Sequence, residues 1–438
     1  MSWLRKFKTR IENFDIFALG NSAVLYYCLI FGTLSFLSLL PFISQISPIL
    51  FDKRLQLPNF QAIFYLMLGI FSFILGYNLS IARIFTKRIP NILKKEWNAK
   101  RVFIVFILVF VAGLMIKFLR ISGGAFSHLG KSTAFLNSSF YSLVGLLDWL
   151  GPVALAIAFA YYFYLLKINN PRYKIWQIIA WLTFAVEFLF GFFSLSRFSV
   201  VIPIIIYLII RHYLCAKSYW RIIMAVFIIL LAIMPLMNFY RNAQNSLRPY
   251  PNIANNQIEV KYSAIGQFVA DSSLSRIDQS RILTAVFQKT ENFLYGKSLL
   301  NFFISLGPPR FLWKDKPVIA GGNEFGRQYG ILATDDFKNS VGPTVIGDWY
   351  MNFGLAGIIL GMFLMGIIFK TIYLYFVKEA NYSLSGVVIY SILWIQIIKG
   401  TEDFIAPVWA GMVKLFVILL IIHFFLVDLR GKTEGNKI

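Results

Sequence analysis

Long apolar segments, separated mostly by short polar ones, recur along the chain. A transmembrane helix needs roughly twenty consecutive apolar residues. Runs that meet or approach this length lie near residues 22–43, 60–82, 102–120, 138–164, 175–195, 198–214, 222–240, 350–377, 384–399 and 405–427. Because 58% of all residues are hydrophobic and only 14% are charged, a water-soluble core cannot hide this surface. The sequence therefore predicts an all-α, polytopic integral membrane protein with about ten transmembrane helices.

The formal net charge of +22 comes from basic residues that cluster between the apolar runs. Short connections rich in lysine and arginine stay on the cytoplasmic side of a membrane. The clusters are Arg83, Lys87, Arg88, Lys94, Lys95, Lys100 and Arg101; Lys167, Arg172 and Lys174; and Arg211, Lys217 and Arg221. With about ten crossings, this pattern predicts that both termini are cytoplasmic. The positive charge thus orients the chain in a bilayer and does not indicate a nucleic-acid partner.

One connection, residues 241–342, is far longer than the others and is predicted to lie on the outer side. Apolar residues recur at helical spacing between Ser272 and Thr290, which indicates a folded loop. We therefore expect three parts: a membrane bundle of about seven spans over 1–240, a large extracytoplasmic loop over 241–342, and a bundle of about three spans over 343–438.

Several well-known catalytic motifs are absent from the sequence. There is no P-loop, no GxSxG, no HExxH and no CxxC, and the chain has 3 histidines and 2 cysteines. The first outer loop offers Asp52 beside Lys53 and Arg54 in place of the paired carboxylates of metal-dependent GT-C transferases. We therefore expect neither a metal ion nor a cofactor.

Arginine is the distinctive residue of the predicted outer face. Its planar guanidinium group suits the oxygens of a phosphate. Arg197 lies in a tight turn between two apolar runs, where a lipid diphosphate would sit, and interfacial snorkelling is the alternative. Arg281 shares a helical face with Leu274 and Ile277, so it marks an anion site or an ion pair. The outer arginines are Arg197, Arg241, Arg248, Arg276, Arg281, Arg310 and Arg327.

Two other groups of polar residues are candidates for function. Pro308, Pro309 and Pro317 restrict the backbone around Arg310 and Lys316, which gives this stretch a fixed shape. Charges inside the apolar runs are costly in hydrocarbon and usually face a cavity or one another. These are Asp148, Glu187 and Lys414, and the outer turn between the last two runs adds Lys399, Glu402 and Asp403.

This arrangement resembles the Wzy-type polymerases of bacterial O-antigen, capsule and exopolysaccharide. The resemblance covers most of the chain in topology, and specific motifs carry it. These are Ser196-Arg197, the stretch from Pro309-Arg310 to Lys316-Pro317, the segment 321–326, and the segment 343–357 with its Asn352-Phe353-Gly354 turn. The Lys399-Gly400 pair departs from the family's pattern, which has an arginine before the glycine. The resemblance implies a GT-C-like fold.

The implied reaction moves a growing glycan from polyprenyl diphosphate onto a polyprenyl-diphosphate-linked repeat unit at the outer face of the bacterial cytoplasmic (inner) membrane. A diphosphate leaving group needs cations, and an attacking sugar hydroxyl needs a carboxylate base. The base candidates are Asp348, Glu324, Glu402 and Asp403. The expected catalytic residues are Arg197, Arg310, Arg281 and Asp348, and the expected substrate-binding residues are Arg241, Lys316, Glu324, Arg327, Trp349, Lys399 and Glu402.

Two other functions remain open at this point. An O-antigen ligase would have a similar outer loop and would differ in its acceptor. A transporter of lipid-linked oligosaccharide would need a deep polar path, which few intramembrane charges supply. The expected partners are the lipid-linked oligosaccharide and the membrane, together with a chain-length regulator and a flippase.

Overall fold

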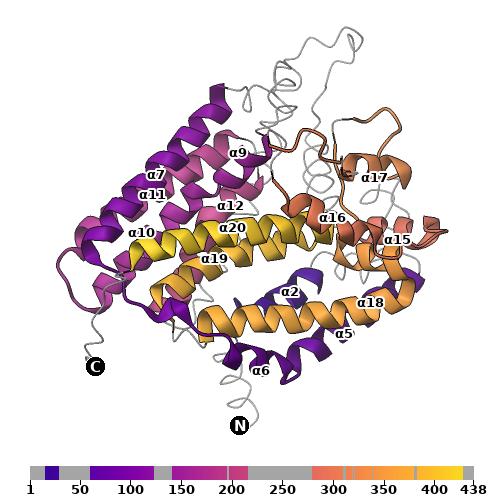
Figure 1. Ribbon diagram of the computed structural model, residues 1–438, viewed down its shortest axis with the longest axis horizontal. Coiled ribbons are helices and arrows are strands. Elements are labelled where there is room, and N and C mark those ends of the chain that lie inside the picture. Colours follow the sequence, from indigo (N-terminus) through magenta and orange to yellow (C-terminus); the bar gives the residue numbers. More distant parts are fainter. Residues whose placement is uncertain are drawn as a thin grey trace, which may run out of the picture.

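The computed structural model is built from helices (Figure 1). It describes residues 15–28, 60–122, 141–194, 197–215, 279–308, 312–317, 319, 321–337, 339–378 and 382–427. The helices are α2 (Leu19–Tyr27), α5 (Phe60–Asn78), α6 (Ile81–Arg88), η2 (Ile92–Lys94), α7 (Ala99–Ser122), α9 (Tyr141–Leu147), α10 (Leu150–Lys167), α11 (Tyr173–Phe193), α12 (Arg197–Leu214), α15 (Ser280–Lys289), α16 (Lys297–Leu306), α17 (Gly322–Gln328), α18 (Thr344–Tyr373), η3 (Leu374–Lys378), α19 (Leu384–Gly400) and α20 (Ile405–Leu426). Within the described residues, the one β contact is a bridge between Trp97 and Val427.

Within the described residues, six helices are long and apolar enough to cross a membrane, which confirms a multi-pass, all-helical membrane protein. They are Phe60–Asn78, Ala99–Ser122, Leu143–Lys167, Tyr173–Phe193, Thr344–Lys378 and Ile405–Leu426, and shorter apolar helices cover Phe198–Leu214, Lys297–Leu306 and Leu384–Gly400. Most of the predicted span 22–43 and all of 222–240 lie outside the described residues. The number of about ten spans and the GT-C-like fold therefore stay predictions.

The helices differ in how much apolar surface they expose. Leu108, Met115 and Phe118 of α7 stand exposed along one face, as lipid-facing residues do. By contrast, α19 is buried at nearly every position from Ser385 to Gly400. It lies in the interior, against α10, α12 and α20. This central helix therefore meets protein along nearly its whole length.

Membrane-spanning helices that follow one another in the chain run in opposite directions. The end of α7 meets the start of α10, since Gly113 packs against the backbone of Gly151. The end of α11 meets the start of α12, since Gly191 packs against Ser199. One end of the bundle thus carries the starts of α10, α12, α18 and α20 and the end of α19. This end also adjoins α15 and α16, which belong to the predicted outer loop, so we call it the loop end.

A break at Phe353–Gly354 divides α18 into two arms. Gly354 has φ +60° and ψ −145°, a backbone conformation that essentially requires glycine. A side chain there would also meet the ring of Phe293 at 2.8 Å. The turn predicted in the Asn352-Phe353-Gly354 motif is confirmed. The helix nevertheless begins at Thr344, earlier than the predicted run 350–377, because a short first arm precedes the turn.

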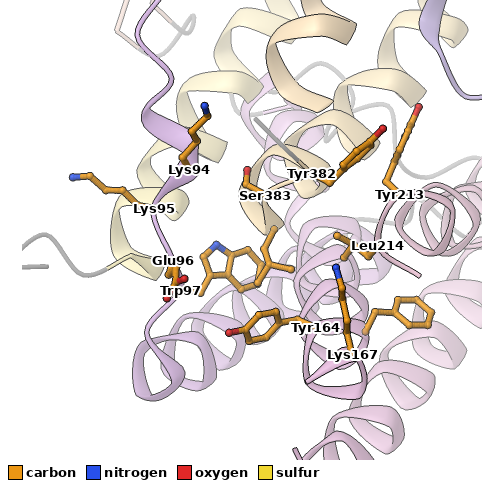
Figure 2. Close-up of a pocket in the computed structure, with 12 residues that line it drawn as sticks. Lys94, Lys95, Glu96, Trp97, Tyr164, Lys167, Tyr213, Leu214, Tyr382 and Ser383 are labelled. Atoms are coloured by element: carbon orange, nitrogen blue, oxygen red, sulfur yellow. The ribbon is translucent and has the colours of Figure 1, made fainter. Parts of the chain in front are cut away.

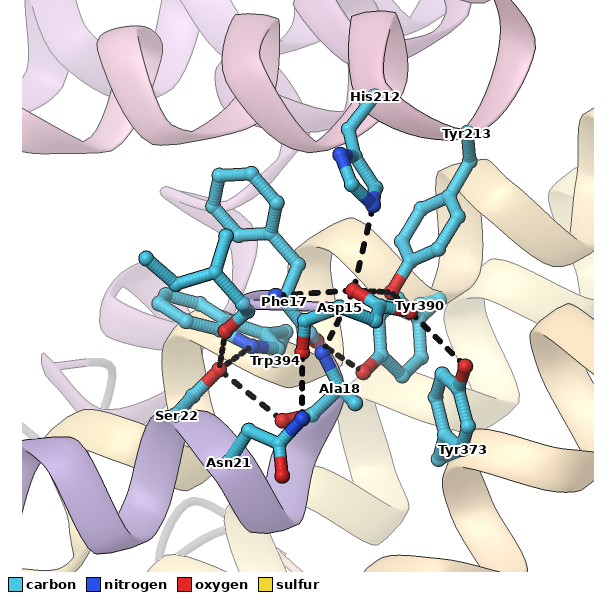
Figure 3. A network of polar contacts seen from close by, with 11 residues as sticks. Asp15, Phe17, Ala18, Asn21, Ser22, His212, Tyr213, Tyr373, Tyr390 and Trp394 are labelled. Carbon is cyan, nitrogen blue, oxygen red and sulfur yellow. Dashed lines mark hydrogen bonds and ion pairs between the residues drawn. The ribbon is translucent and has the colours of Figure 1, made fainter. Parts of the chain in front are cut away.

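Asp15 fixes the start of α2 to two other helices at the opposite end of the bundle (Figure 3). Its carboxylate accepts hydrogen bonds from the hydroxyls of Tyr373 at 2.8 Å and Tyr213 at 3.0 Å, and His212 lies 3.2 Å away. Tyr390 of α19 donates to the carbonyl oxygen of Phe17 at 2.6 Å. One carboxylate therefore joins α2, α12 and α18, with α19 attached beside it.

The charges buried within the spans are paired. Lys117 of α7 lies 2.8 Å from Glu187 of α11, and both are almost fully buried. Arg120 and Asp148 form a second ion pair one turn further along α7. Gly151 is required beside the first pair, because a side chain there would collide with both charged groups. Asp148 and Glu187 each face a charged side chain, as expected for acids within the spans. Their basic partners, Lys117 and Arg120, were not among the predicted residues.

Candidate functional site

Two polar residues interrupt the buried surface of α19 near the loop end. Between Ser385 and Gly400, Gln396 is half-buried, Lys399 is exposed, and every other residue is buried. The two lie three positions apart and so share one side of the helix. Gln396 lines a pocket, and Lys399 is exposed at the end of the helix.

A pocket of about 400 Å³ lies beside Gln396. Its wall is formed by the start of α10, the end of α16 and the first half of α20, which contribute Trp149, Ser305 and Lys414 among others. The pocket is therefore built from both predicted membrane bundles and from a helix of the predicted outer loop. Such a junction of separate parts is a usual place for a ligand site.

Lys414 and Lys316 gather the carbonyl groups at the end of α16. Lys414 donates to the carbonyl oxygen of Ser305 at 2.6 Å and to that of Gly307 at 3.3 Å. Lys316 donates to Gly307 at 3.2 Å and to Pro308 at 3.1 Å. The final carbonyls of a helix carry partial negative charge, so the two ammonium groups complement them. This cluster fixes the chain at the pocket wall directly before Pro309 and Arg310, which lie outside the described residues.

Lys399 lies beside the start of α12, where Arg197 is located. Its Nζ lies 4.7 Å from the centre of the Phe198 ring. Arg197 is the neighbour of Phe198 and begins α12, although its side chain is outside the described part of the structure. The backbone therefore brings the predicted Arg197 and Lys399 positions together.

Asp348 lies at the centre of a polar cluster and not on the pocket wall. It is fully buried. One carboxylate oxygen accepts from Ser298 at 2.7 Å and Asn352 at 3.1 Å. The other accepts from the backbone N–H of Ile405 at 2.9 Å, where a carboxylate complements the start of α20. Asp348 thus holds α16, α18 and α20 together.

The predicted acids of the outer turn lie at the loop end. Glu402 accepts a hydrogen bond from the Tyr26 hydroxyl of α2. Asp403 is exposed, and its carboxylate accepts from the N–H of Phe404 at 2.8 Å. Lys399 precedes the same turn, so both acids are close to Lys399 in the sequence.

Three predicted substrate-binding residues do not line the pocket. Glu324 is exposed on α17. Arg327 lies over the ring of Phe337, 4.3 Å from its centre. Trp349 packs against the second arm of α18, where a side chain at Gly361 would collide with its ring. Its indole Nε1 is buried with no hydrogen-bond partner among the described residues. None of the three is among the described residues that line the pocket.

The remaining predicted residues are not fully described. Arg241 and Arg310 lie outside the described residues, and only the backbone of Arg281 is described, within α15. That helix confirms the helical spacing predicted before Thr290 over Ser280–Lys289, whereas 272–278 lie outside the described residues. Sequence reasoning missed Trp149 and Gln396, although a glutamine within an apolar run is a usable signal. Among the described residues, no group of three or more His, Cys, Asp or Glu is placed to hold a metal ion.

Comparison with known proteins gives one match. Residues 329–408 match the family model described as "Putative O-antigen polymerase". No curated protein and no solved structure matches the chain. The matched segment contains α18, α19 and the turn with Lys399, and so includes the polar side of α19. It confirms the resemblance to the Wzy-type polymerases that the motif over 343–357 predicts, and it supports a polymerase role in polysaccharide synthesis for this multi-pass membrane protein.

Proposed function

We propose that the protein transfers a growing glycan from polyprenyl diphosphate onto a polyprenyl-diphosphate-linked repeat unit, at the outer face of the bacterial cytoplasmic membrane. The observation that carries this proposal is the pocket lined by Gln396 and Lys414, with Lys399 three positions after Gln396 on α19. A cavity at membrane depth with cations around it suits a ligand that has an apolar tail, an anionic diphosphate and a polar glycan.

In this reaction the acceptor hydroxyl attacks the anomeric carbon of the donor glycan. A glycosidic bond forms, the bond between the sugar and the phosphate oxygen breaks, and polyprenyl diphosphate leaves with the bonding electrons. Lys399, Arg197 and Arg310 stabilise the negative charge that develops on the diphosphate. Lys316 and Lys414 set the position of Arg310 by holding the chain before it.

The hydroxyl proton passes to a carboxylate. Glu402 and Asp403 are the acids nearest in sequence to Lys399, so we propose that the base lies in this turn. Asp348 has a positioning role in this proposal, because its hydrogen bonds to Ser298 and Ile405 tie α16 and α20 to α18. Trp149 supplies an aromatic wall for the substrate.

The directions of the helices support the proposed topology. The positively charged connections after α5, α10 and α12 lie at the end opposite the loop end. If these connections are cytoplasmic, the pocket opens toward the outer side and both termini are cytoplasmic. A polymerase that acts after its substrates have crossed the membrane requires this arrangement.

Deletion of the gene tests the proposal against its rivals. A polymerase-null strain should keep surface glycan that carries one repeat unit, because ligation and export do not need polymer. The wild-type gene should restore the ladder, and a Lys399→Ala gene should not. Loss of even the single-repeat glycan from the null strain would instead indicate a ligase or a transporter.

A further inference from the structure

A second pocket lies at the opposite end of the bundle from the candidate site. It has a volume of about 260 Å³ and lies between the end of α10, the end of α12, the start of α19 and the segment before α7. Lys167 is the last residue of α10, Leu214 is the last of α12, and Leu384 is the first of α19. A pocket where several spans end lies at the depth of lipid headgroups.

The pocket carries excess positive charge. Its lining includes the lysines Lys94, Lys95 and Lys167 and one acid, Glu96. In Figure 2, Lys167 rises into the space between Tyr164 and Leu214, whereas Lys94 and Lys95 occupy the far rim. Within the described part of the chain, no hydrogen bond or ion pair holds any of these three ammonium groups. The pocket thus presents free cations to a ligand.

Aromatic side chains form much of the remaining wall, and polar contacts hold two of them in place. Tyr213 donates its hydroxyl to Asp15 at 3.0 Å, and its ring stacks on that of Tyr382 with centres 5.9 Å apart. Trp97 donates its indole N–H to Ser385 at 2.6 Å. The wall is therefore formed before any ligand arrives, which lowers the entropic cost of binding.

We propose that this pocket binds a phosphoryl group at the membrane boundary opposite the polymerising site. Ammonium groups bind phosphate oxygens as point charges, and tyrosine and tryptophan side chains are typical of the membrane interface. An anionic phospholipid headgroup and a soluble phosphate compound share this chemistry. Binding here does not depend on the proposed polymerase reaction.

Thermal unfolding of the purified full-length protein in detergent tests the proposal. Phosphatidylglycerol, phosphatidylcholine and inorganic phosphate are titrated separately. Phosphatidylglycerol should raise the unfolding midpoint of the wild type more than phosphatidylcholine does. Each lysine near an anionic surface contributes about a fivefold gain in affinity, so Lys167→Gln should weaken phosphatidylglycerol binding about fivefold and the triple variant with Lys94→Gln and Lys95→Gln roughly a hundredfold.

Lys174→Gln is the matched control, because Lys174 is exposed at the same end of the bundle but does not line the pocket. It should bind phosphatidylglycerol as the wild type does. Inorganic phosphate could also raise the unfolding midpoint at concentrations similar to those of the lipid. If Lys167→Gln removes that effect, the pocket is a phosphoryl site whose ligand is a soluble phosphate compound. Equal weakening by Lys174→Gln and Lys167→Gln, or equal protection by the two lipids, would overturn the proposal. The midpoint without lipid shows whether each variant is folded.

Discussion

Lys414, in the middle of a membrane-spanning helix, donates a 2.6 Å hydrogen bond from Nζ to the backbone carbonyl oxygen of Ser305. The two residues belong to α20 and α16, which pack along one another. A lysine within a span is costly unless it has partners, and here the end of a helix supplies them. The contact joins the predicted outer loop to the membrane bundle at the wall of the pocket.

Replacement of Lys414 should therefore act on both stability and polymerisation. Lys414→Met removes the donor and leaves the carbonyl groups of Ser305 and Gly307 without it, which should lower the free energy of unfolding by about 2 kcal/mol. Lys414→Arg should keep most of the stability. Thermal unfolding in detergent and glycan ladders in cells measure the two effects. Wild-type unfolding midpoints and ladders for Lys414→Met would contradict this role.

The arginines and the lysine of the candidate site should differ in which substitutions preserve polymerisation. Arg197→Lys and Arg310→Lys should impair polymerisation, because a lysine cannot bind two phosphate oxygens as a guanidinium fork does. Lys399→Arg should remain active, and Lys399→Ala should lose roughly a hundredfold in rate. Membrane abundance should stay unchanged for Lys399→Ala, since this side chain is exposed. If lysine restores wild-type ladders at Arg197 and Arg310, these arginines only anchor the chain at the interface.

Asp348 offers a test between positioning and catalysis. Asp348→Ala leaves Ser298, Asn352 and the N–H of Ile405 without their acceptor in a buried place, which should cost about 3 kcal/mol of folding free energy. The amount of folded protein should fall, while the polymerisation rate of each folded molecule is largely kept. Glu402→Gln and Asp403→Asn provide the comparison, and loss of activity at normal abundance is expected for the base. The same loss at normal abundance in Asp348→Ala would make Asp348 the catalytic base.

The Asp15 cluster should make stability depend on pH in the acid range. Burial raises the pKa of the Asp15 carboxyl, and the hydrogen bond and charge of His212 lower it. The hydroxyls of Tyr373 and Tyr213 act in the same direction, so the pKa lies below its ordinary value. A lowered pKa contributes stability that is complete above the unfolded value of about 3.9 and is lost as pH falls through the folded value.

The stability difference between wild type and Asp15→Asn should therefore shrink as the pH falls from about 5 to below about 4. Unfolding midpoints measured across this range provide the test. Asp335→Asn, which alters an exposed acid, should follow the wild type throughout. A difference that grows as the pH falls would show that the Asp15 contacts do not favour the carboxylate.

The sequence predicts the helices well where one apolar run makes one helix. The runs near 60–82, 102–120 and 175–195 correspond closely to α5, α7 and α11. It does not reveal α16, because an apolar helix of 10 residues is too short to resemble a span. The break in α18 was visible as a motif, since Gly354 has a conformation that other residues rarely adopt.

The candidate site was harder to predict, because it depends on contacts between distant segments. The cationic residues Lys316, Lys399 and Lys414 are apparent in the sequence, but their partners are backbone carbonyls and a phenylalanine ring. Nothing in the sequence near Asp348 shows that it binds the N–H of Ile405. The residue type therefore shows which chemistry a side chain can perform. Whether that side chain contacts substrate or supports the fold is known only from how the helices pack.

The most direct measurement follows the products of the purified protein in vesicles that contain polyprenyl-diphosphate-linked repeat units. Mass spectrometry of the lipid-linked glycans should show two, three and more repeat units on one polyprenyl diphosphate. One molecule of free polyprenyl diphosphate should appear for each new glycosidic bond. Lys399→Ala protein, at equal amount, should form these products roughly a hundred times more slowly. Repeat units that remain single in the presence of folded wild-type protein, or that only cross the membrane, would contradict the proposed polymerisation.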